Sequence, residues 1–509
     1  MRDNLGQEQL AIIIGGGPAG LTCAYELSKS GVPGIVLESD HVLGGIARTV
    51  DYKGYLFDIG GHRFFTKWDE VQKIWDEILG DKFLRRPRLS RIYYSGRMFL
   101  YPLKPFNTLF GLGAIESVRI IGSYLRSRIF PYKKEENVEQ WVSNRFGRRL
   151  YGTFFKTYTE KVWGMPCTEI QAEWAAQRIK GLSLISAVRN ALLPGGRAKA
   201  KTLIDEFQYP ERGPGQMWEM LAERIQRKGQ KILKGRRVTR ICHAGGKITH
   251  VVTNGPQGQE TFQGAHFVSS MPIRDLIRAL DPPAPPEVRE SAGKLRYRDF
   301  LIVSLILNRA NVVPDNWIYI HEPGVRVGRI QNFKNWSPSM VPDASKTCLG
   351  MEYFVFENDD VWSSRDSDLV EMAKRELVQL GLAKMEEIED GTVVRMPKAY
   401  PIYDTGWTEH VDRIRHYLQE AMPNLQLVGR NGMHKYNNQD HSMMTALYAA
   451  RNILGEQHDV WAVNTEPDYH EEKTDSEVTA LRELRRPAYA EPPRIEPVRP
   501  APEGASRAA

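Results

Sequence analysis

The feature that most constrains this chain lies near its start, where an apolar run, a glycine-rich turn and an amphipathic segment follow one another. Leu10–Ile14 is uninterruptedly apolar, the sequence GGGPAG occupies residues 15–20, and helical periodicity runs from Pro18 to Ser30. After a short turn, a second apolar run ends at Glu38. A strand, a GxGxxG turn, a helix, a second strand and an acidic residue about 20 residues further on are typical of a βαβ unit that binds a dinucleotide.

Each part of this unit has a separate physical role. Gly15 permits the tight turn, Gly17 lets the backbone approach a pyrophosphate, and Gly20 lets the helix pack closely on the strand. The start of the helix adds unpaired N–H groups and the positive end of the helix dipole. The carboxylate of Glu38 is placed to accept hydrogen bonds from ribose hydroxyls and would repel a 2′-phosphate.

Two further glycine pairs follow the unit, Gly44-Gly45 with Arg48 close behind, and Gly60-Gly61 with His62 directly after. Either pair alone could be an ordinary turn. Their joint occurrence resembles the amine oxidase-like superfamily of flavoproteins, in which the second glycine cluster lines the flavin. This resemblance implies FAD as the cofactor and places His62 near the isoalloxazine ring.

The remaining patterns favour an α/β fold with three parts: a Rossmann-type FAD-binding domain, an inserted helical domain and an antiparallel β-sheet substrate domain. Helical patterning extends from about residue 113 to 190, and short alternating segments follow at 230–270 and 298–355. Beyond about residue 465 the chain becomes polar and then proline-rich, which predicts a disordered tail. We expect the FAD-binding domain at 1–105, 201–290 and 411–460, the helical insertion at 106–200, the substrate domain at 291–410 and the tail at 461–509.

Composition excludes several classes of protein. The four cysteines among 509 residues form no CxxC pair, so neither a disulfide framework nor a zinc site is expected, and a cytoplasmic location fits. The first ten residues are polar, unlike a signal peptide, and no apolar run approaches the roughly 20 residues of a membrane span. The net charge of +7 is spread along the chain without a basic tract, which argues against nucleic acid and suits a small anionic substrate.

Later motifs resemble the UDP-galactopyranose mutases, and their eukaryotic-type branch in particular, in segments scattered from about residue 10 to 455. The matching segments are YTEKVW at 158–163, PCTEIQ at 166–171 leading to Trp174 and Arg178, NWIY at 316–319, Gly328-Arg329, NWSP at 335–338, GRNG at 429–432, Tyr436 and NQDHS at 438–442. The resemblance implies that Arg178 and Arg329 hold a substrate diphosphate beside the flavin. A planar guanidinium suits this role because it makes bidentate, permanently charged contacts to phosphate.

The resemblance also assigns the remaining site residues, although a plain core role stays open for each tyrosine. It implies catalytic roles for His62, Arg178 and Arg329. The residues predicted to contact the cofactor are Gly15, Gly17, Pro18, Ala19, Gly20, Glu38, Gly44, Gly45, Arg48, Gly60, Gly61, His62, Val238, Gly429, Asn438, Gln439, Asp440 and Ser442. Those predicted to contact the substrate are Tyr101, Arg178, Tyr319, Arg329, Trp336, Tyr400 and Tyr436. No metal ligands are predicted, because His62, His434 and His441 lack ligand spacing with carboxylates or thiols.

The implied reaction is a redox-neutral isomerisation of a nucleotide-diphosphate sugar between pyranose and furanose forms, through an adduct between the sugar and N5 of reduced FAD (FADH⁻). NAD(P)H could serve as the external reductant, and a homo-oligomer is left open. The rival interpretation is an FAD-dependent oxidase or desaturase of the amine oxidase, protoporphyrinogen oxidase or carotenoid desaturase type, with an apolar substrate pocket. Trp336 in place of the usual tyrosine, and the extra charges of Arg48 and Arg63, depart from the mutase pattern. A non-enzymatic binding protein of the GDP-dissociation inhibitor type would have no need for complete glycine motifs.

Overall fold

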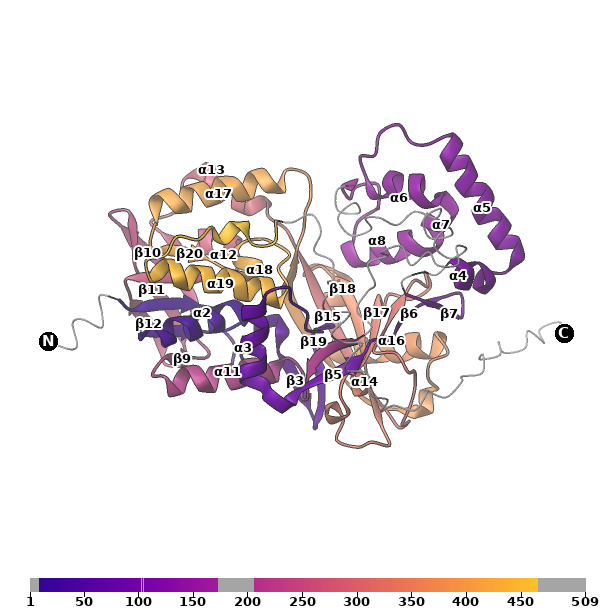
Figure 1. Cartoon of the computed structure of the whole chain (residues 1–509), viewed down its shortest axis with the longest axis horizontal. Helices are drawn as coiled ribbons and strands as arrows, with labels where there is room; N and C mark the ends of the chain where they lie inside the picture. The colour runs from indigo at the N-terminus through magenta and orange to yellow at the C-terminus, as the bar shows by residue number, and fades with distance from the viewer. Residues whose placement is uncertain (1–8, 102, 104, 173–205, 466–509) are drawn as a thin grey trace.

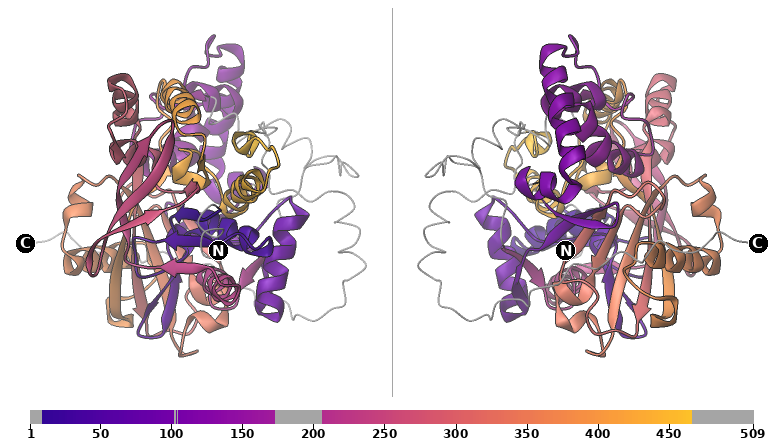
Figure 2. Two further views of the ribbon diagram at one scale, coloured as in Figure 1. Left: turned by 90° about the vertical axis from the view of Figure 1, so that its left-hand side faces the viewer. Right: turned by 90° about the vertical axis from the view of Figure 1, so that its right-hand side faces the viewer.

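The computed structural model describes residues 9–101, 103, 105–172 and 206–465. A parallel sheet with its helices lies at one side, a large sheet lies at the centre, and a helical lobe lies at the other side (Figure 1). In the right-hand view of Figure 2 the helical lobe stands in front of both sheets. This arrangement confirms the predicted α/β fold class.

The parallel sheet has the strand order β20-β13-β1-β2-β9. Its strands are β1 (Ala11–Ile14), β2 (Gly34–Leu37), β9 (Lys231–Leu233), β13 (His266–Ser269) and β20 (Leu425–Leu427). All four residues of β1 are buried, because helices cover a parallel sheet on both faces. The surrounding helices are α2 (Pro18–Lys29), α3 (Asp69–Leu79), α11 (Gly215–Arg227), α12 (Ile273–Arg278), α13 (Pro286–Lys294), α17 (Trp407–Ala421), α18 (Gly429–Gly432) and α19 (Gln439–Ile453).

The central sheet has the order β19-β15-β18-β17-β16-β6-β7 and is antiparallel except where β6 meets β16. Its strands are β6 (Ser90–Tyr94), β7 (Arg97–Leu100), β15 (Tyr297–Leu307), β16 (Trp317–Ile320), β17 (Arg329–Asn332), β18 (Thr347–Val355) and β19 (Ile388–Pro401). The predicted domain division had assigned residues 1–105 to the FAD-binding domain. The structure instead pairs β6 and β7 with the substrate sheet, because Ser90–Tyr93 hydrogen-bonds alongside β16.

Smaller elements complete the chain. A four-stranded sheet contains β10 (Arg237–Ala244), β11 (Lys247–Gly255), β12 (Gly258–Gln263) and β14 (Leu280–Asp281), and two strand pairs join β3 (Thr49–Tyr52) to β4 (Tyr55–Asp58) and β5 (Phe83–Pro87) to β8 (Glu206–Pro210). The helical lobe contains α4 (Pro105–Leu112), α5 (Ala114–Ile129), α6 (Val138–Phe146), α7 (Arg148–Tyr151), a π-helix (Gly152–Lys156) and α8 (Thr157–Trp163). Three further helices flank the sheets: the short α14 (Phe333–Trp336) and α15 (Asp360–Ser363) and the longer α16 (Asp366–Gln379). There are also 3₁₀ turns at Gly45–Ala47, Gly80–Lys82, Pro338–Met340, Met385–Glu387 and Val460–Ala462.

The last described residues are anchored against the body of the protein. The Lys435 ammonium donates to the carbonyls of Trp461, at 3.1 Å, and Val463, at 2.6 Å. The predicted tail boundary at 461 therefore lies too early, since these contacts hold the backbone as far as Val463. The rest of the predicted tail, residues 466–509, lies outside the described residues. Within the described part of the chain, no helix has both the length and the apolar character needed to cross a membrane.

Buried histidines make the stability of the protein sensitive to acid. His321, His434 and His441 are 4%, 0% and 1% exposed. Burial lowers their pKa to about 3, about 4 and about 3 respectively. An unfolded histidine titrates near pH ~6.5, so below that pH the unfolded chain binds more protons than the folded one. The free energy of unfolding is expected to fall as the pH drops from about 6.5 towards 4, by roughly 1.4 kcal/mol per pH unit for each histidine.

Urea unfolding across this pH range measures the effect. In His321→Phe the new ring can keep the stacking on Tyr158, where the ring centroids are 4.9 Å apart. In this variant the free energy of unfolding should depend less steeply on pH, by the contribution of one proton. An unchanged slope in the variant would contradict the assignment.

Candidate active site

A cavity of about 1210 Å³ lies between the parallel sheet and the central sheet. It exceeds the roughly 300–1,000 Å³ of most small-ligand pockets, so it has room for an extended cofactor and a substrate. Most of the sequence-predicted site residues lie on its wall, from the first glycine turn to the last helix. These are Gly15, Gly17, Pro18, Ala19, Glu38, Gly45, Arg48, Gly60, Gly61, His62, Tyr101, Val238, Tyr319, Arg329, Tyr400, Gly429, Tyr436, Asn438, Gln439, Asp440 and Ser442.

The first glycine turn is shaped by close backbone approach. Gly15 has a φ of +105°, and a Cβ added at Gly20 would lie 1.9 Å from the carbonyl oxygen of Gly15. The turn at Gly15 and the close approach at Gly20 bring the start of α2 against the end of β1, so that the unpaired N–H groups of the helix face the cavity. Gly17 faces the second glycine loop, where its added Cβ would lie 3.8 Å from the Cα of Gly45. Gly20 and Gly44 themselves are not on the cavity wall; they shape the loops beneath it.

Glu38 is held at the end of β2 by backbone donors. Its Oε2 accepts from the N–H of Gly16 at 2.6 Å, and its Oε1 accepts from the N–H of Asp40 at 2.8 Å. Arg48 forms an ion pair of 2.5 Å with Asp40 within the second loop, and the N–H of Gly44 donates to the carbonyl of Gly16 at 2.9 Å, which holds the second loop beside the first. The carboxylate therefore has a defined position from which its remaining lone pairs can accept hydroxyl groups.

The wall also contains buried polar atoms suited to a bound cofactor. Among the described residues, Nδ1 of His62, Oδ1 of Asn431 and Oε1 of Gln439 are buried and have no hydrogen-bond partner. Buried polar atoms are normally hydrogen-bonded, so these three indicate groups that a ligand completes. Together with the glycine turns and Glu38, they fit a flavin dinucleotide that extends from α2 to α19.

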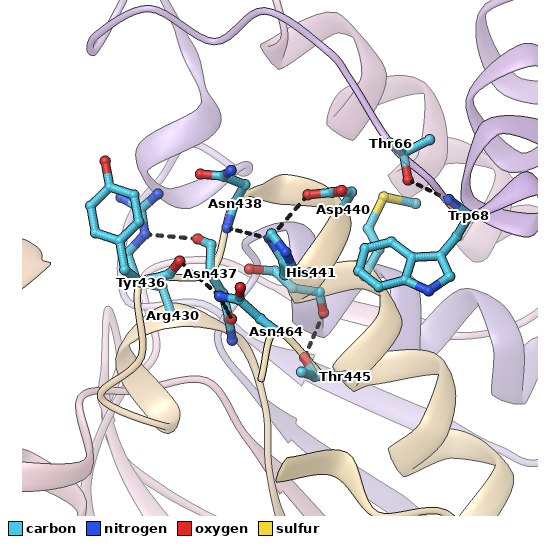
Figure 3. A network of polar contacts seen from close by, with 12 residues as sticks. Thr66, Trp68, Arg430, Tyr436, Asn437, Asn438, Asp440, His441, Thr445 and Asn464 are labelled. Atoms are coloured by element: carbon cyan, nitrogen blue, oxygen red, sulfur yellow. Dashed lines mark hydrogen bonds and ion pairs between the residues drawn. The ribbon is translucent and has the colours of Figure 1, made fainter. Parts of the chain in front are cut away.

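The loop before α19 is stabilised by a polar network around Asn437 (Figure 3). The Asn437 amide donates to the carbonyl of Gly429 at 3.1 Å, and the amide of Asn464 donates to Oδ1 of Asn437 at 3.0 Å. Nε of Arg430 donates to the Asn437 carbonyl at 2.9 Å. The network fixes the backbone from which residues 438–442 face the cavity.

His62 is neutral at physiological pH. Burial lowers its pKa to about 3, and the positive charges of Arg430 and Arg329 act in the same direction. A neutral imidazole donates a hydrogen bond at one nitrogen and accepts one at the other, according to its tautomer. It does not carry the extra proton with which an imidazolium would act as an acid. This is compatible with the predicted role of His62 beside the flavin.

Arg329 reaches the cavity from β17 and is held by a buried carboxylate. Its Nε donates to Glu352 on β18, the residue opposite it in the register of the two strands. Glu352 is fully buried and also accepts from Nε2 of Gln331 at 2.8 Å. Burial raises the pKa of Glu352, and the positive charge of Arg329 opposes this shift. The pair thus orients a guanidinium towards the cavity with its carboxylate on the protein side.

Four tyrosines and a second arginine share the cavity wall with Arg329. The rings of Tyr400 and Tyr436 are stacked with centroids 5.6 Å apart, and the guanidinium of Arg430 lies 5.4 Å and 4.9 Å from these two centroids. Tyr101 and Tyr319 form another pair at 4.7 Å. The hydrogen bonds of Arg430 go to backbone carbonyls, which do not cancel its charge. This wall therefore combines positive charge with phenol groups.

Sequence reasoning missed Arg430 as a cavity residue. The signal was present in the GRNG motif, where Arg430 directly follows Gly429, a predicted cofactor contact with a φ of +77°. Besides Gly20 and Gly44, two residues predicted to contact the substrate are not seen at the site. Arg178 lies outside the described residues. Trp336 is a core residue, 1% exposed, whose Nε1 donates to the carbonyl of Asn316 at 2.9 Å, and it packs under Gly61 rather than on the cavity wall.

The family described as "flavin containing amine oxidoreductase" matches residues 18–454. The chain belongs to this family. Its members contain a flavin, which implies FAD in the dinucleotide site described above. Within the part of the chain that the structure describes, no group of three or more His, Cys, Asp or Glu side chains could hold a metal ion.

Curated relatives match only part of the chain. A pseudooxynicotine dehydrogenase from Pseudomonas sp is 39% identical over 166 residues, 26% of this chain and 33% of that protein. A 1-hydroxycarotenoid 3,4-desaturase from Flavobacterium sp. (strain P99-3) is 23% identical over 263 residues, 48% of this chain and 53% of that protein. The chain thus spans between a third and about half of the length of these relatives.

Solved structures match the fold over nearly the whole chain. A reduced UDP-galactopyranose mutase superposes with a TM-score of 0.77 at 22% identity, covering 90% of this chain and 98% of that one. A putative protoporphyrinogen oxidase from Exiguobacterium sp. 255-15 gives a TM-score of 0.66 at 17% identity, covering 88% and 99%. At these identities the likeness establishes the fold of the flavoenzymes and leaves the reaction to be argued from the site.

FAD is expected to be held without a covalent bond. Among the described residues, none of the four cysteines lies on the cavity wall, so a thioether link to the flavin has no donor there. Denaturing the purified protein should release a yellow supernatant that identifies as FAD by chromatography. Flavin that remains on the precipitated protein, or FMN in the supernatant, would contradict this expectation.

Proposed function

We propose that the protein isomerises a nucleotide-diphosphate sugar between its pyranose and furanose forms, with FAD as the cofactor. The observation that carries this proposal is the wall formed by Arg329, Arg430 and the tyrosine pairs, which faces the same cavity as the dinucleotide-binding turn. A substrate with a diphosphate needs such a wall, whereas an apolar amine or polyene does not.

The side chains divide the work between binding and charge stabilisation. Arg329 and Arg430 would hold the diphosphate oxygens, and Arg329 would stabilise the negative charge that develops when the diphosphate leaves the anomeric carbon. The phenols of Tyr319, Tyr400 and Tyr436 would donate to the same oxygens while their rings pack against the nucleotide. A reduced flavin bound here would supply an electron-rich nitrogen as the nucleophile for the anomeric carbon.

The proposed reaction can be tested with the enzyme reduced by dithionite under anaerobic conditions. Incubation with UDP-, GDP- and dTDP-linked hexopyranoses, followed by chromatography, should reveal an isomeric product from one of them. The same enzyme with oxidised flavin is the control and should form no product. No NAD(P)H should be consumed in proportion to product once the flavin is reduced.

A second candidate function is the FAD-dependent oxidation or desaturation of an apolar substrate, which the dehydrogenase and desaturase among the partial relatives favour. In that case one substrate molecule would be oxidised for each flavin reduced. Stoichiometric oxidation of an amine or polyene, without isomerisation of any nucleotide sugar, would replace the first proposal by the second.

A further inference from the structure

The outer face of α5 carries an apolar stripe that points away from the rest of the protein. Ile115, Val118, Leu125 and Ile129 are 73%, 69%, 54% and 69% exposed. They are three, seven and four residues apart in sequence, which puts them on one side of a helix. The opposite side, including Ile120 and Tyr124, is buried in the lobe. In the right-hand view of Figure 2 the helices of this lobe face the viewer, and Figure 1 places α5 at its outer edge.

The borders of the stripe are basic. On the helix surface Arg119 and Arg126 flank one side, and Arg128 flanks the other. Lys133 and Lys134 follow shortly after the helix and are exposed, and Lys134 is paired with Glu136 at 3.9 Å. The acidic residue of α5, Glu116, is paired with Arg149 and with Arg119, the latter at 3.7 Å. The borders of the stripe therefore carry net positive charge. Glu116, the one acidic residue of α5, is already paired with arginines and does not offset the other basic residues.

A basic pocket lies beside the N-terminal end of the same helix. It has a volume of about 630 Å³ and is formed by the β6–β7 hairpin, the end of α4, the first turn of α5, α7 and the π-helix. Its wall contains the guanidinium groups of Arg97, Arg148 and Arg149 against the single carboxylate of Glu116. Arg97 donates to the carbonyl of Gly111, and Arg148 lies 4.7 Å from the ring centroid of Tyr132. Neither contact cancels a charge, so the pocket keeps an excess of positive charge that suits a phosphate group.

We propose that the helical lobe docks on an anionic lipid surface, with the α5 stripe in the acyl boundary and the basic pocket on a phosphate headgroup. An amphipathic helix with exposed aliphatic residues and arginines at its borders binds at such an interface through both apolar burial and attraction to anionic lipids. A second copy of the chain suits the stripe less well, because it would bring basic borders against basic borders. The pocket and the stripe are separate features of the lobe, and one kind of partner, apolar and anionic, satisfies both.

Flotation of the full-length, flavin-loaded protein with vesicles tests the proposal. Binding to phosphatidylcholine vesicles that contain phosphatidylglycerol should exceed binding to phosphatidylcholine alone at least about tenfold, and it should weaken as salt is added. Leu125→Asp should lower the partition coefficient by about tenfold or more, because it places a charge in the acyl boundary. Arg128→Gln and Arg148→Gln should each lower it about fivefold.

Met385→Asp is the matched control, since Met385 is an exposed apolar residue, 44% accessible, in a 3₁₀ turn beside the central sheet. It should bind vesicles like the unaltered protein. Ile129→Asn, a milder change on the stripe, should weaken binding in the same direction as Leu125→Asp. Unchanged flavin content and melting temperature in each variant verify that the lobe is folded.

Three results would overturn the proposal. The first is equal binding to anionic and neutral vesicles, or none to either. The second is a doubled mass in sedimentation without lipid that Leu125→Asp abolishes, because the stripe would then join two copies. The third is vesicle binding that inorganic phosphate displaces and Leu125→Asp leaves intact, because the pocket would then be a site for a free anion.

Discussion

Replacing Arg329 with alanine is expected to reduce turnover of a nucleotide-diphosphate sugar by on the order of a hundredfold, while the protein keeps its FAD. The guanidinium faces the cavity from β17, and the charge it would stabilise develops in the transition state. Arg329→Lys should recover only part of the activity, because an ammonium cannot reproduce the bidentate contact. The measurements are kcat with pre-reduced enzyme at saturating substrate and the ratio of flavin to protein.

The structure adds a control that separates chemistry from stability. Loss of Arg329 leaves the buried carboxylate of Glu352 without its cation, which typically costs about 3–5 kcal/mol. The double variant Arg329→Ala/Glu352→Gln removes that carboxylate and should regain much of the lost melting temperature. Its turnover should stay low. Recovery of turnover along with stability would mean that Arg329 acts through the fold and not on the substrate.

Replacing Gly20 with alanine is expected to abolish FAD retention and to destabilise the protein by about 1–3 kcal/mol. The added Cβ would lie 1.9 Å from the carbonyl oxygen of Gly15 and 3.3 Å from Cγ2 of Ile13. The nearer atom belongs to the backbone, so relief requires that α2 move away from β1. That movement would displace the N–H groups that face the cavity. Urea unfolding and the flavin-to-protein ratio measure the two effects.

Gly293→Ala is the matched control for this change. Gly293 also lies in a helix, α13, and a Cβ added there meets no heavy atom within 4 Å. The same substitution should therefore stabilise the protein by up to about 1 kcal/mol, through the higher helix propensity of alanine. Normal flavin content in Gly20→Ala would show that the turn tolerates the extra atom and would contradict the packing argument.

The βαβ unit and its glycine turn could be predicted from the sequence because their signals are local. The apolar run before Gly15 and the periodicity after Pro18 match β1 and α2 to within a residue at each end. The glycine motifs mark positions where a side chain would collide with the backbone, as at Gly20. A glycine is needed at such a position, and it is visible in the sequence. The turn at residues 15–20 and Glu38 were predicted from such local patterns, whereas Asn438, Gln439, Asp440 and Ser442 were predicted from the resemblance to the mutases.

What could not be predicted depends on contacts between distant segments. The parallel pairing of Arg91 with Ile318 joins strands from opposite halves of the chain, and no local pattern encodes it. Trp336 was expected at the substrate, but its ring stacks on Trp317 in the core, which only the packing of several strands decides. The anchoring of Asn464 on Asn437 likewise depends on a single amide in an otherwise polar stretch.

That last contact has a consequence for how the protein acquires its cofactor in the cell. The wall of the cavity begins at Ile14 and ends at Thr465, so it needs segments from both ends of the described chain as well as from between them. Ribosomes deliver roughly 5–20 residues per second, and the N-terminal half of the site emerges long before its partner. Until α19 has been synthesised, the nascent βαβ unit lacks the part of the cavity wall that α19 supplies. We therefore expect flavin capture to be a late event of biogenesis, after the segment that ends at Asn464 has emerged from the ribosome.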